Sequence, residues 1–184
     1  MANRVTLEGI GSYVTVLEPK PDLKGQMKYS ISVLIPKKFP GRIDPLKTAI
    51  LQAAKEKWGD KALAVLSKAR YPTIRDGDAE VTKDGDPVKE TKGMWVVRTR
   101  SDRKPGIVGP NPKEPMHFDD DNCYSGCTFR VSVSVYGYEA EGNRGVTCGL
   151  EAVQVCAMGP RIDGRIAAED AFAEYKPDDV DPLL

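Results

Sequence analysis

Histidine, cysteine and long apolar runs are scarce in this sequence. The 184 residues include one histidine and four cysteines, and 7% of them are aromatic. No segment approaches the roughly 20 apolar residues needed to span a bilayer, and the first residues lack the apolar stretch of a secretory signal. The apolar content of 40% is nevertheless enough for a folded core. We therefore expect a soluble, intracellular protein rather than a membrane protein or a disordered chain.

Common catalytic and nucleotide-binding motifs are also missing. The sequence contains no Walker-type phosphate loop, no Gly-x-Gly-x-x-Gly after a predicted strand and no Gly-x-Ser-x-Gly. The single histidine, His117, lies beside Asp119–Asp121 in a predicted loop, and a lone loop histidine is a weak indication of acid–base catalysis. We therefore predict that the protein is not an enzyme and uses no cofactor.

The cysteines do not have the spacing of a metal site. They are Cys123, Cys127, Cys148 and Cys156. Structural zinc sites usually use paired Cys-x2-Cys motifs, which this spacing does not provide. Disulfides are rare inside cells. The prediction is therefore no metal and four reduced thiols that pack as small apolar groups.

A neutral total charge conceals two parts of opposite sign. The chain has 27 basic and 27 acidic residues, but residues 169–184 hold six acids and one base, and so residues 1–168 carry a net charge of +5. Pro177 and Pro182 disfavour a helix at the end of the chain. We predict a folded domain over residues 1–168 and a flexible acidic tail over residues 169–184. The tail is either a solvated terminus or an interaction segment that competes with polyanions for the basic domain.

Alternating apolar and polar residues predict a chain that is mainly β. Five substantial strands are expected at residues 4–17, 27–35, 94–100, 127–138 and 146–156. Gly9 and Gly11 indicate a bulge or sharp bend in the first strand. In the fourth strand, Arg130, Tyr136 and Tyr138 lie on the polar face, opposite an apolar row.

Helical periodicity interrupts these strands between the second and the third. Asp44 and Pro45 form a helix start, with Asp44 as the expected cap, and Gly59 fits the exit. A second short helix is expected over residues 61–68. Prolines make residues 105–115 a loop. The pattern predicts a small closed or partly open barrel with a helical insertion, and an open β-sandwich is the alternative.

Basic and aromatic residues occur together around the third and fourth predicted strands. Single-stranded nucleic acids bind such surfaces, because phosphates attract Lys and Arg while unpaired bases stack on flat rings. The expected phosphate contacts are Lys28, Arg98, Arg100, Arg103, Lys104 and Arg130. The expected stacking residues are Trp95, Tyr124, Tyr136 and Tyr138. Binding of this kind would be independent of sequence.

Several motifs, taken in order, resemble those of a known phage family. The most specific is Tyr124-Ser125-Gly126-Cys127, which runs into the strand at residues 128–138 and is followed by Gly149-Leu150 and Val153-Gln154. Further matching segments are residues 28–30, 34–37, 75–78, 143–146, 164–165 and 170–172. This order resembles a family of bacteriophage single-stranded DNA-binding proteins that was long catalogued as a domain of unknown function. The resemblance extends from about residue 4 to about residue 175.

The resemblance implies an OB-fold, a five-stranded barrel with a helical insertion. It implies sequence-independent binding of single-stranded DNA in phage replication or recombination, in the cytoplasm of the infected bacterial host. Distant relatives have an acidic tail that contacts replication enzymes and screens the DNA groove. By this likeness Asp178, Asp179 and Asp181 are the partner-binding residues, although this tail ends in Leu183-Leu184 where many such tails end in an aromatic residue.

Two other functions remain open on the residues alone. A phage structural or assembly protein would use the Tyr136–Tyr138 face to contact another subunit and would form a fixed homo-oligomer. A small nuclease or hydrolase would bind a divalent metal at Asp119–Asp121. The sequence specifies neither the oligomeric state nor the number of nucleotides covered.

Overall fold

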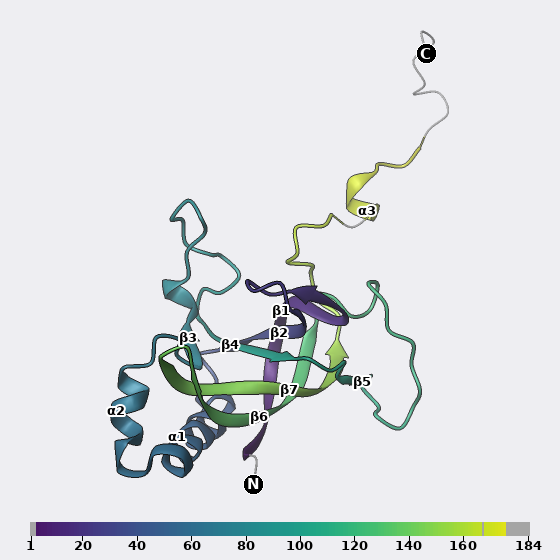
Figure 1. The fold of residues 1–184 in the computed structure, drawn as a ribbon. Coiled ribbons are helices and arrows are strands. Elements are labelled where there is room, and N and C mark those ends of the chain that lie inside the picture. Colours follow the sequence, from purple (N-terminus) through teal and green to yellow (C-terminus); the bar gives the residue numbers. More distant parts are fainter. Residues whose placement is uncertain (1–2, 167, 176–184) are drawn as a thin grey trace.

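The protein, described by a computed structural model over residues 3–166 and 168–175, is built mainly of β-strands (Figure 1). The strands are β1 (Asn3–Pro21), β2 (Met27–Pro36), β3 (Ile74–Asp76), β4 (Met94–Ser101), β5 (Gly106–Val108), β6 (Thr128–Ala140) and β7 (Asn143–Ala157). The helices are α1 (Asp44–Trp58), α2 (Ala62–Ser67) and α3 (Ala168–Ala171). Short 3-10 turns lie at Pro40–Arg42, Gly59–Lys61 and Gly77–Ala79. None of the described helices has the length and apolar character needed to cross a membrane.

Five long strands close into a barrel. The sheet order is β3-β4-β2-β1-β6-β7-β5, and β4 also pairs with β7, so that β4, β2, β1, β6 and β7 form a ring. The helices α1 and α2 come between β2 and β4, the second and third strands of the ring. The predicted five-stranded OB barrel with this insertion is confirmed, and the ring closure is inconsistent with the open sandwich.

The core fills the barrel with the apolar faces that alternation predicts. On β6, Phe129, Val131, Val133 and Val135 are buried, because every second side chain of a strand points to the same side. The short helices close one end of the barrel and bury small residues such as Ala53 and Ala54 against it (Figure 1). The insertion therefore covers one end of the core.

Two local predictions were wrong. Asp44 makes no capping hydrogen bond with its side chain, and Ile43 occupies the N-cap position of α1. Residues 105–115 are not entirely loop, since β5 pairs in parallel with β7 through Gly106, Ile107 and Val108. This strand lies at the sheet edge, where neighbouring prolines are tolerated.

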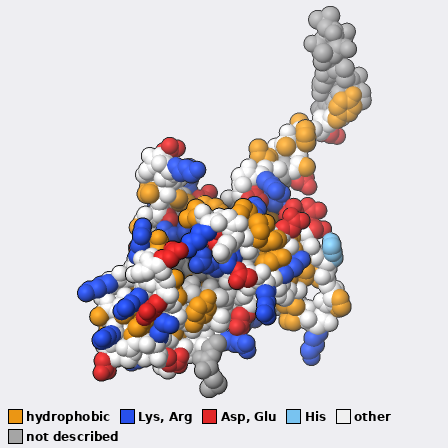
Figure 2. All heavy atoms as spheres, in the orientation of Figure 1, with side chains coloured by type: hydrophobic (Ala, Val, Ile, Leu, Met, Phe, Trp, Pro, Cys, Tyr) orange, Lys and Arg blue, Asp and Glu red, His pale blue; other side chains and the backbone are white. Residues whose placement is uncertain are grey.

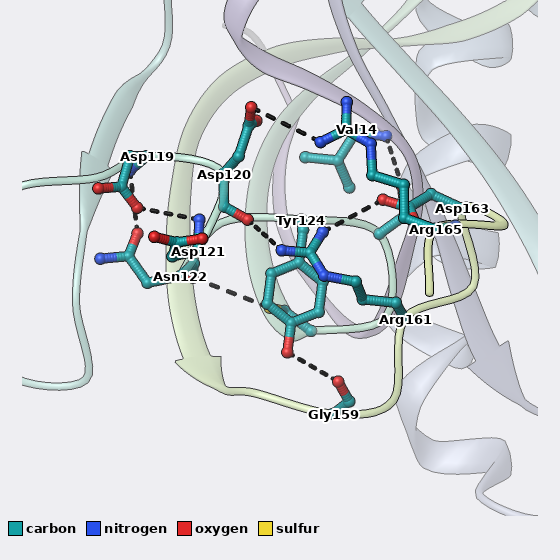
Figure 3. A network of polar contacts seen from close by, with 12 residues as sticks. Val14, Asp119, Asp120, Asp121, Asn122, Tyr124, Gly159, Arg161, Asp163 and Arg165 are labelled. Carbon is teal, nitrogen blue, oxygen red and sulfur yellow. Dashed lines mark hydrogen bonds and ion pairs between the residues drawn. The ribbon is translucent and has the colours of Figure 1, made fainter. Parts of the chain in front are cut away.

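The segment after β7 is fixed against the barrel by a polar network around Tyr124 (Figure 3). The Arg161 guanidinium lies 4.0 Å from the centre of the Tyr124 ring and donates a hydrogen bond to the Asp120 carbonyl at 2.5 Å. The Tyr124 hydroxyl donates to the Gly159 carbonyl at 2.8 Å. Beyond this network, α3 stands clear of the barrel (Figure 1). The predicted tail contacts Asp178, Asp179 and Asp181 lie outside the described residues.

Candidate nucleic-acid interface

The outer face of β2 and β4 carries two arginines. In the antiparallel register Ser30 pairs with Arg100 and Ser32 pairs with Arg98. The alternate residues of both strands, such as Ile31 and Thr99, are buried. Since neighbouring partners share a face, Arg98 and Arg100 project from the barrel between two small serines.

Neither arginine has a carboxylate partner among residues 3–166 and 168–175. Arg75, on the adjacent β3, pairs with Glu80 at 2.7 Å. Burial first, and then the positive charge of Arg75, lower the pKa of Arg98, while Glu80 and Tyr13 act in the opposite direction. A guanidinium stays charged in spite of such shifts, and so Arg98 is a partly desolvated cation suited to an anionic ligand.

Tyr13 adds an exposed ring beside these arginines. The pairing of β1 with β2 shifts register between Ser12 and Thr15, and the intervening Tyr13 has a φ of +48°. Its side chain is 78% exposed. A left-handed backbone disfavours tyrosine by about 1–2 kcal/mol, and bulges commonly redirect a side chain near a functional site. Sequence reasoning missed Tyr13, because glycines at residues 9 and 11 indicated a bend without showing which residue would bulge.

The same outer surface continues onto β7 and β6. Arg100 pairs with Gly149 of β7, and Gly149 pairs with Ser134 of β6. A Cβ at Gly149 would lie 3.3 Å from Cε1 of Tyr136, and so this ring rests over the glycine and remains 49% exposed. Tyr138 lies over Gly145 in the same way, since a Cβ on that glycine would lie 3.1 Å from the tyrosine ring. The two glycines of β7 thus provide room for two flat tyrosines.

Two turns lie beside this surface. The β1–β2 turn begins at Asp22, whose pKa is lowered chiefly by a hydrogen bond from the Gln26 amide and, to a lesser extent, by the nearby charge of Arg100. Lys24 of this turn pairs with Glu141 of the β6–β7 turn at 2.5 Å. In OB-folds the loops between strands flank the oligonucleotide-binding face. Figure 2 shows basic side chains grouped near the centre of its view, next to apolar ones.

We define the outer β-face as Tyr13, Arg98, Arg100, Tyr136 and Tyr138. Four of these residues were predicted as DNA contacts. The tyrosines and arginines come from three different strands, β1, β4 and β6. The arrangement offers positive charge beside exposed aromatic rings, which is the chemistry that single-stranded nucleic acid requires.

The remaining predicted contacts lie elsewhere or are already engaged. Trp95 points to the inner side of β4 and packs against the core, with the Lys37 ammonium 4.6 Å from its ring centre. The Tyr124 ring is covered by Arg161 (Figure 3). Lys28 forms an ion pair with Asp102. We therefore leave these three residues out of the outer β-face.

The other basic residues lie along its borders. Arg103 and Lys104 are exposed directly after β4, and the Arg103 amide donates to the Ser101 hydroxyl at 3.0 Å. Arg130 is exposed on β6 and pairs across the strands with Glu8 and Gln154. Six residues separate Arg130 from Tyr136, or about 20 Å along a strand. Arg130 would therefore contact a different stretch of any bound strand.

The acidic loop shows no metal arrangement. The Asp119 carboxylate accepts a hydrogen bond from the Asp121 amide at 3.0 Å and so stabilises its own loop. Within the described residues, no three His, Cys, Asp or Glu side chains are grouped as metal ligands. The cysteines are free thiols, and three of them, Cys123, Cys127 and Cys148, are buried as predicted.

Comparison with known proteins identifies the family. A family model described as Enterobacter phage Enc34, ssDNA-binding protein, matches residues 5–182. This chain belongs to that family. Protein p50 of Acyrthosiphon pisum secondary endosymbiont phage 1, described as putative, is 28% identical over 167 residues, which are 88% of this chain and 86% of the relative.

Solved structures of phage proteins have the same fold. The single-stranded DNA-binding protein of bacteriophage Enc34 superposes with a TM-score of 0.67 at 22% identity, over 92% of this chain and 89% of the other. The same protein in complex with ssDNA gives 0.69 at 20% identity, over 87% and 89%. The single-stranded DNA-binding protein gp2.5 of bacteriophage T7 gives 0.55 at 13% identity, over 89% and 97%. The family resemblance inferred from the motifs is confirmed.

Proposed function

We propose that this protein binds single-stranded DNA without sequence preference during phage DNA replication or recombination, and that it does so without catalysis. Membership of the Enc34 family supports the ligand. The observation that supports the site is the exposed Tyr13 ring, held in a left-handed bulge beside the partly desolvated Arg98. Its place of action would be the cytoplasm of the infected bacterial host.

The outer β-face supplies the two interactions that such binding needs. Arg98 and Arg100 would contact phosphates, and each contact would release counterions on binding. Tyr13 and Tyr136 would stack with bases, and stacking discriminates little between bases because every base has a π-face. Arg103 and Lys104, at the exposed end of β4, would extend the phosphate path.

The acidic tail at residues 169–184 would regulate this interface. Its net charge of −5 opposes the +5 of residues 1–168. We propose that the tail competes with DNA for the basic face and contacts replication or recombination enzymes through Asp178, Asp179 and Asp181. A protein that ends at Ala168 would then bind single-stranded DNA more tightly than the intact chain, most clearly at low salt.

Fluorescence anisotropy of a labelled thymidine oligomer tests the proposal. The intact protein should prefer the single strand over a duplex of equal length, and the logarithm of its affinity should fall linearly with the logarithm of salt concentration. Changing both Arg98 and Arg100 to Ala should reduce that slope by about 2, one for each phosphate that the variant no longer neutralises.

Lys55→Ala is the matched control, because Lys55 is an exposed base on α1 that is not part of the outer β-face. It should leave the slope unchanged. If the double arginine variant kept the affinity and slope of the unaltered protein while it remained folded, the outer β-face would not be the site. If the intact protein and the version ending at Ala168 both failed to bind, the function itself would be wrong, and subunit assembly would become the leading alternative.

A further inference from the structure

The described part of the C-terminal segment carries aromatic side chains that stand away from their own barrel. We call residues 168–175 the C-terminal arm; it begins with the short helix α3. Phe172 and Tyr175 are 79% and 77% exposed. The arm also has three acidic residues, Glu169, Asp170 and Glu174, and no basic residue. Aromatic side chains dominate the energetics of protein interfaces, and so these two exposed rings give the acidic arm a means of docking on another surface.

A matching surface lies at the opposite corner of the molecule. The helices α1 and α2 border a hollow of about 240 Å³. Its apolar lining consists of Ile50, Leu66, Ala69, Pro72, Ile74 and Val146. We call this hollow the helix pocket. The helix pocket is a hollow open to solvent, and its mainly apolar lining offers a surface against which one aromatic ring can rest.

The charges around the helix pocket complement those of the arm. Lys47 forms part of its lining. Residues 44–70, which contain both helices, hold six basic and three acidic residues, a net charge of +3 against the −3 of the arm. Figure 2 shows lysine and arginine side chains over this corner of the molecule. Opposite charges around an apolar contact favour encounter and exclude wrong partners.

The position of the arm directs it to a second copy rather than to its own pocket. Its root is fixed against the barrel by Arg161, which lies over Tyr124 and hydrogen-bonds to the Asp120 carbonyl (Figure 3). From this root the arm leads away from the barrel, whereas α1 and α2 lie at the other end (Figure 1). The chain therefore presents an apolar acidic arm at one end and an apolar basic pocket at the other.

We infer that the C-terminal arm of one copy docks in the helix pocket of the next, with Phe172 or Tyr175 as the inserted ring. The two surfaces are different, and so the contact is heterologous and leaves a free arm and a free pocket at the ends of each assembly. Such contacts build open chains when their rotation does not close a ring. An interface of this size is weak on its own.

A complementation experiment on the full-length protein tests the contact. Phe172→Ala with Tyr175→Ala removes the rings and keeps every acidic residue of the arm. Leu66→Glu places a carboxylate in the helix pocket. Sedimentation velocity should show concentration-dependent self-association of the unaltered protein, weakened at least about tenfold in each variant. An equal mixture of the two variants should restore one contact and form dimers, but no larger species.

Crosslinking identifies the two surfaces directly and does not depend on the stability of the pocket variant. A photoreactive phenylalanine analogue at position 172 should crosslink to peptides within residues 44–74. In a mixture of ¹⁴N- and ¹⁵N-labelled protein, these crosslinks should join the two isotopes.

Matched controls separate this inference from the proposed function. Phe39→Ala removes an exposed aromatic ring outside the arm and should leave self-association unchanged. The arm variant should bind a short thymidine oligomer as tightly as the unaltered protein does, because its tail charge is intact. Crosslinks confined to one isotope, crosslinks to other surfaces, or a mixture that stays monomeric would each overturn the inference.

Discussion

Replacing Tyr13 with glycine should raise the stability of this protein and lower its affinity for single-stranded DNA. The backbone at Tyr13 has a φ of +48°, which glycine adopts without steric cost. Its ring is 78% exposed, so that truncation removes little buried area. The same ring is the most accessible aromatic surface of the outer β-face. Stability and binding should therefore change in opposite directions.

Both magnitudes can be estimated from the structure. Relief of the left-handed backbone is worth about 1–2 kcal/mol, and the extra flexibility of unfolded glycine removes about 0.5–1 kcal/mol of that gain. The net stabilisation at Tyr13 should be about 0–1.5 kcal/mol. Loss of one stacked base should weaken binding by about 1–3 kcal/mol, which is roughly 5- to 150-fold in affinity.

Urea unfolding and anisotropy with a thymidine oligomer measure the two effects. The urea midpoint should rise at an unchanged slope. Tyr13→Ala is the informative companion, because it removes the ring but keeps the strained Cβ; it should lose affinity without gaining stability. Tyr13→Phe should retain both properties of the unaltered protein. A glycine variant that was less stable, or that bound DNA normally, would refute the reasoning about the bulge.

Three further predictions concern glycines and thiols. Gly149→Val should crowd the Ser134 hydroxyl, which lies 2.7 Å from the position of a Cβ there, and the adjacent ring of Tyr136, and should lower single-strand affinity roughly tenfold in an anisotropy titration, while circular dichroism shows a folded barrel; an unchanged affinity would contradict DNA binding at this part of the outer β-face. Gly126→Ala should lower the free energy of unfolding by about 2–4 kcal/mol, since φ is +119° there and a Cβ would collide with the Pro160 carbonyl after β7; a normal urea midpoint would contradict this. Burial raises the pKa of Cys123 and Cys148 to about 12 from a usual value of 9, and so both thiols should resist a thiol reagent at pH 8 until urea is added; the stability they contribute should be complete below pH 9 and should be lost as pH rises from 9 to 12.

The repeat of apolar residues along the sequence predicted the long strands and helices, because each of them carries one clear pattern of this kind. The row of Phe129, Val131, Val133 and Val135 is buried on β6, as its alternation implies. The short strands β3 and β5 have three residues each, too few for alternation to be visible. Their pairing is imposed by long-range contacts with β4 and β7, which a local pattern does not contain.

The candidate site was only partly predictable for a related reason. Alternation on β4 already separated Trp95 from Arg98 and Arg100, but it did not show which face would be internal. The glycines of β1 indicate a bend on sequence grounds, and in the structure they also allow close packing. A Cβ at Gly9 would collide with the Leu34 carbonyl, and one at Gly11 would collide with the ring of Phe129. The residue that bulges, Tyr13, has no sequence signal of its own.

A short contact between β4 and β7, which we call the seam, closes the barrel. The strands β4 and β7 are joined through only two residue pairs among the described residues, Thr99 with Cys148 and Arg100 with Gly149, whereas β1 and β6 pair over eight consecutive residues. Amide hydrogens at such a seam should exchange with solvent faster than those of β1 and β6, because a local opening there breaks few hydrogen bonds.

One of the proposed DNA-contacting arginines lies on this seam. A DNA strand bound to Arg100 of β4 and to Tyr136 of β6 would cross over β7, which lies between them in the sheet. Opening the seam would then move Arg100 away from Tyr136 while both contact the same DNA strand. The bound DNA would therefore stabilise the strand contact that has the fewest residue pairs in the ring. DNA binding would thus slow the local opening of the β4–β7 contact, and slower amide exchange at Arg100 and Gly149 would report both the binding and the stabilisation.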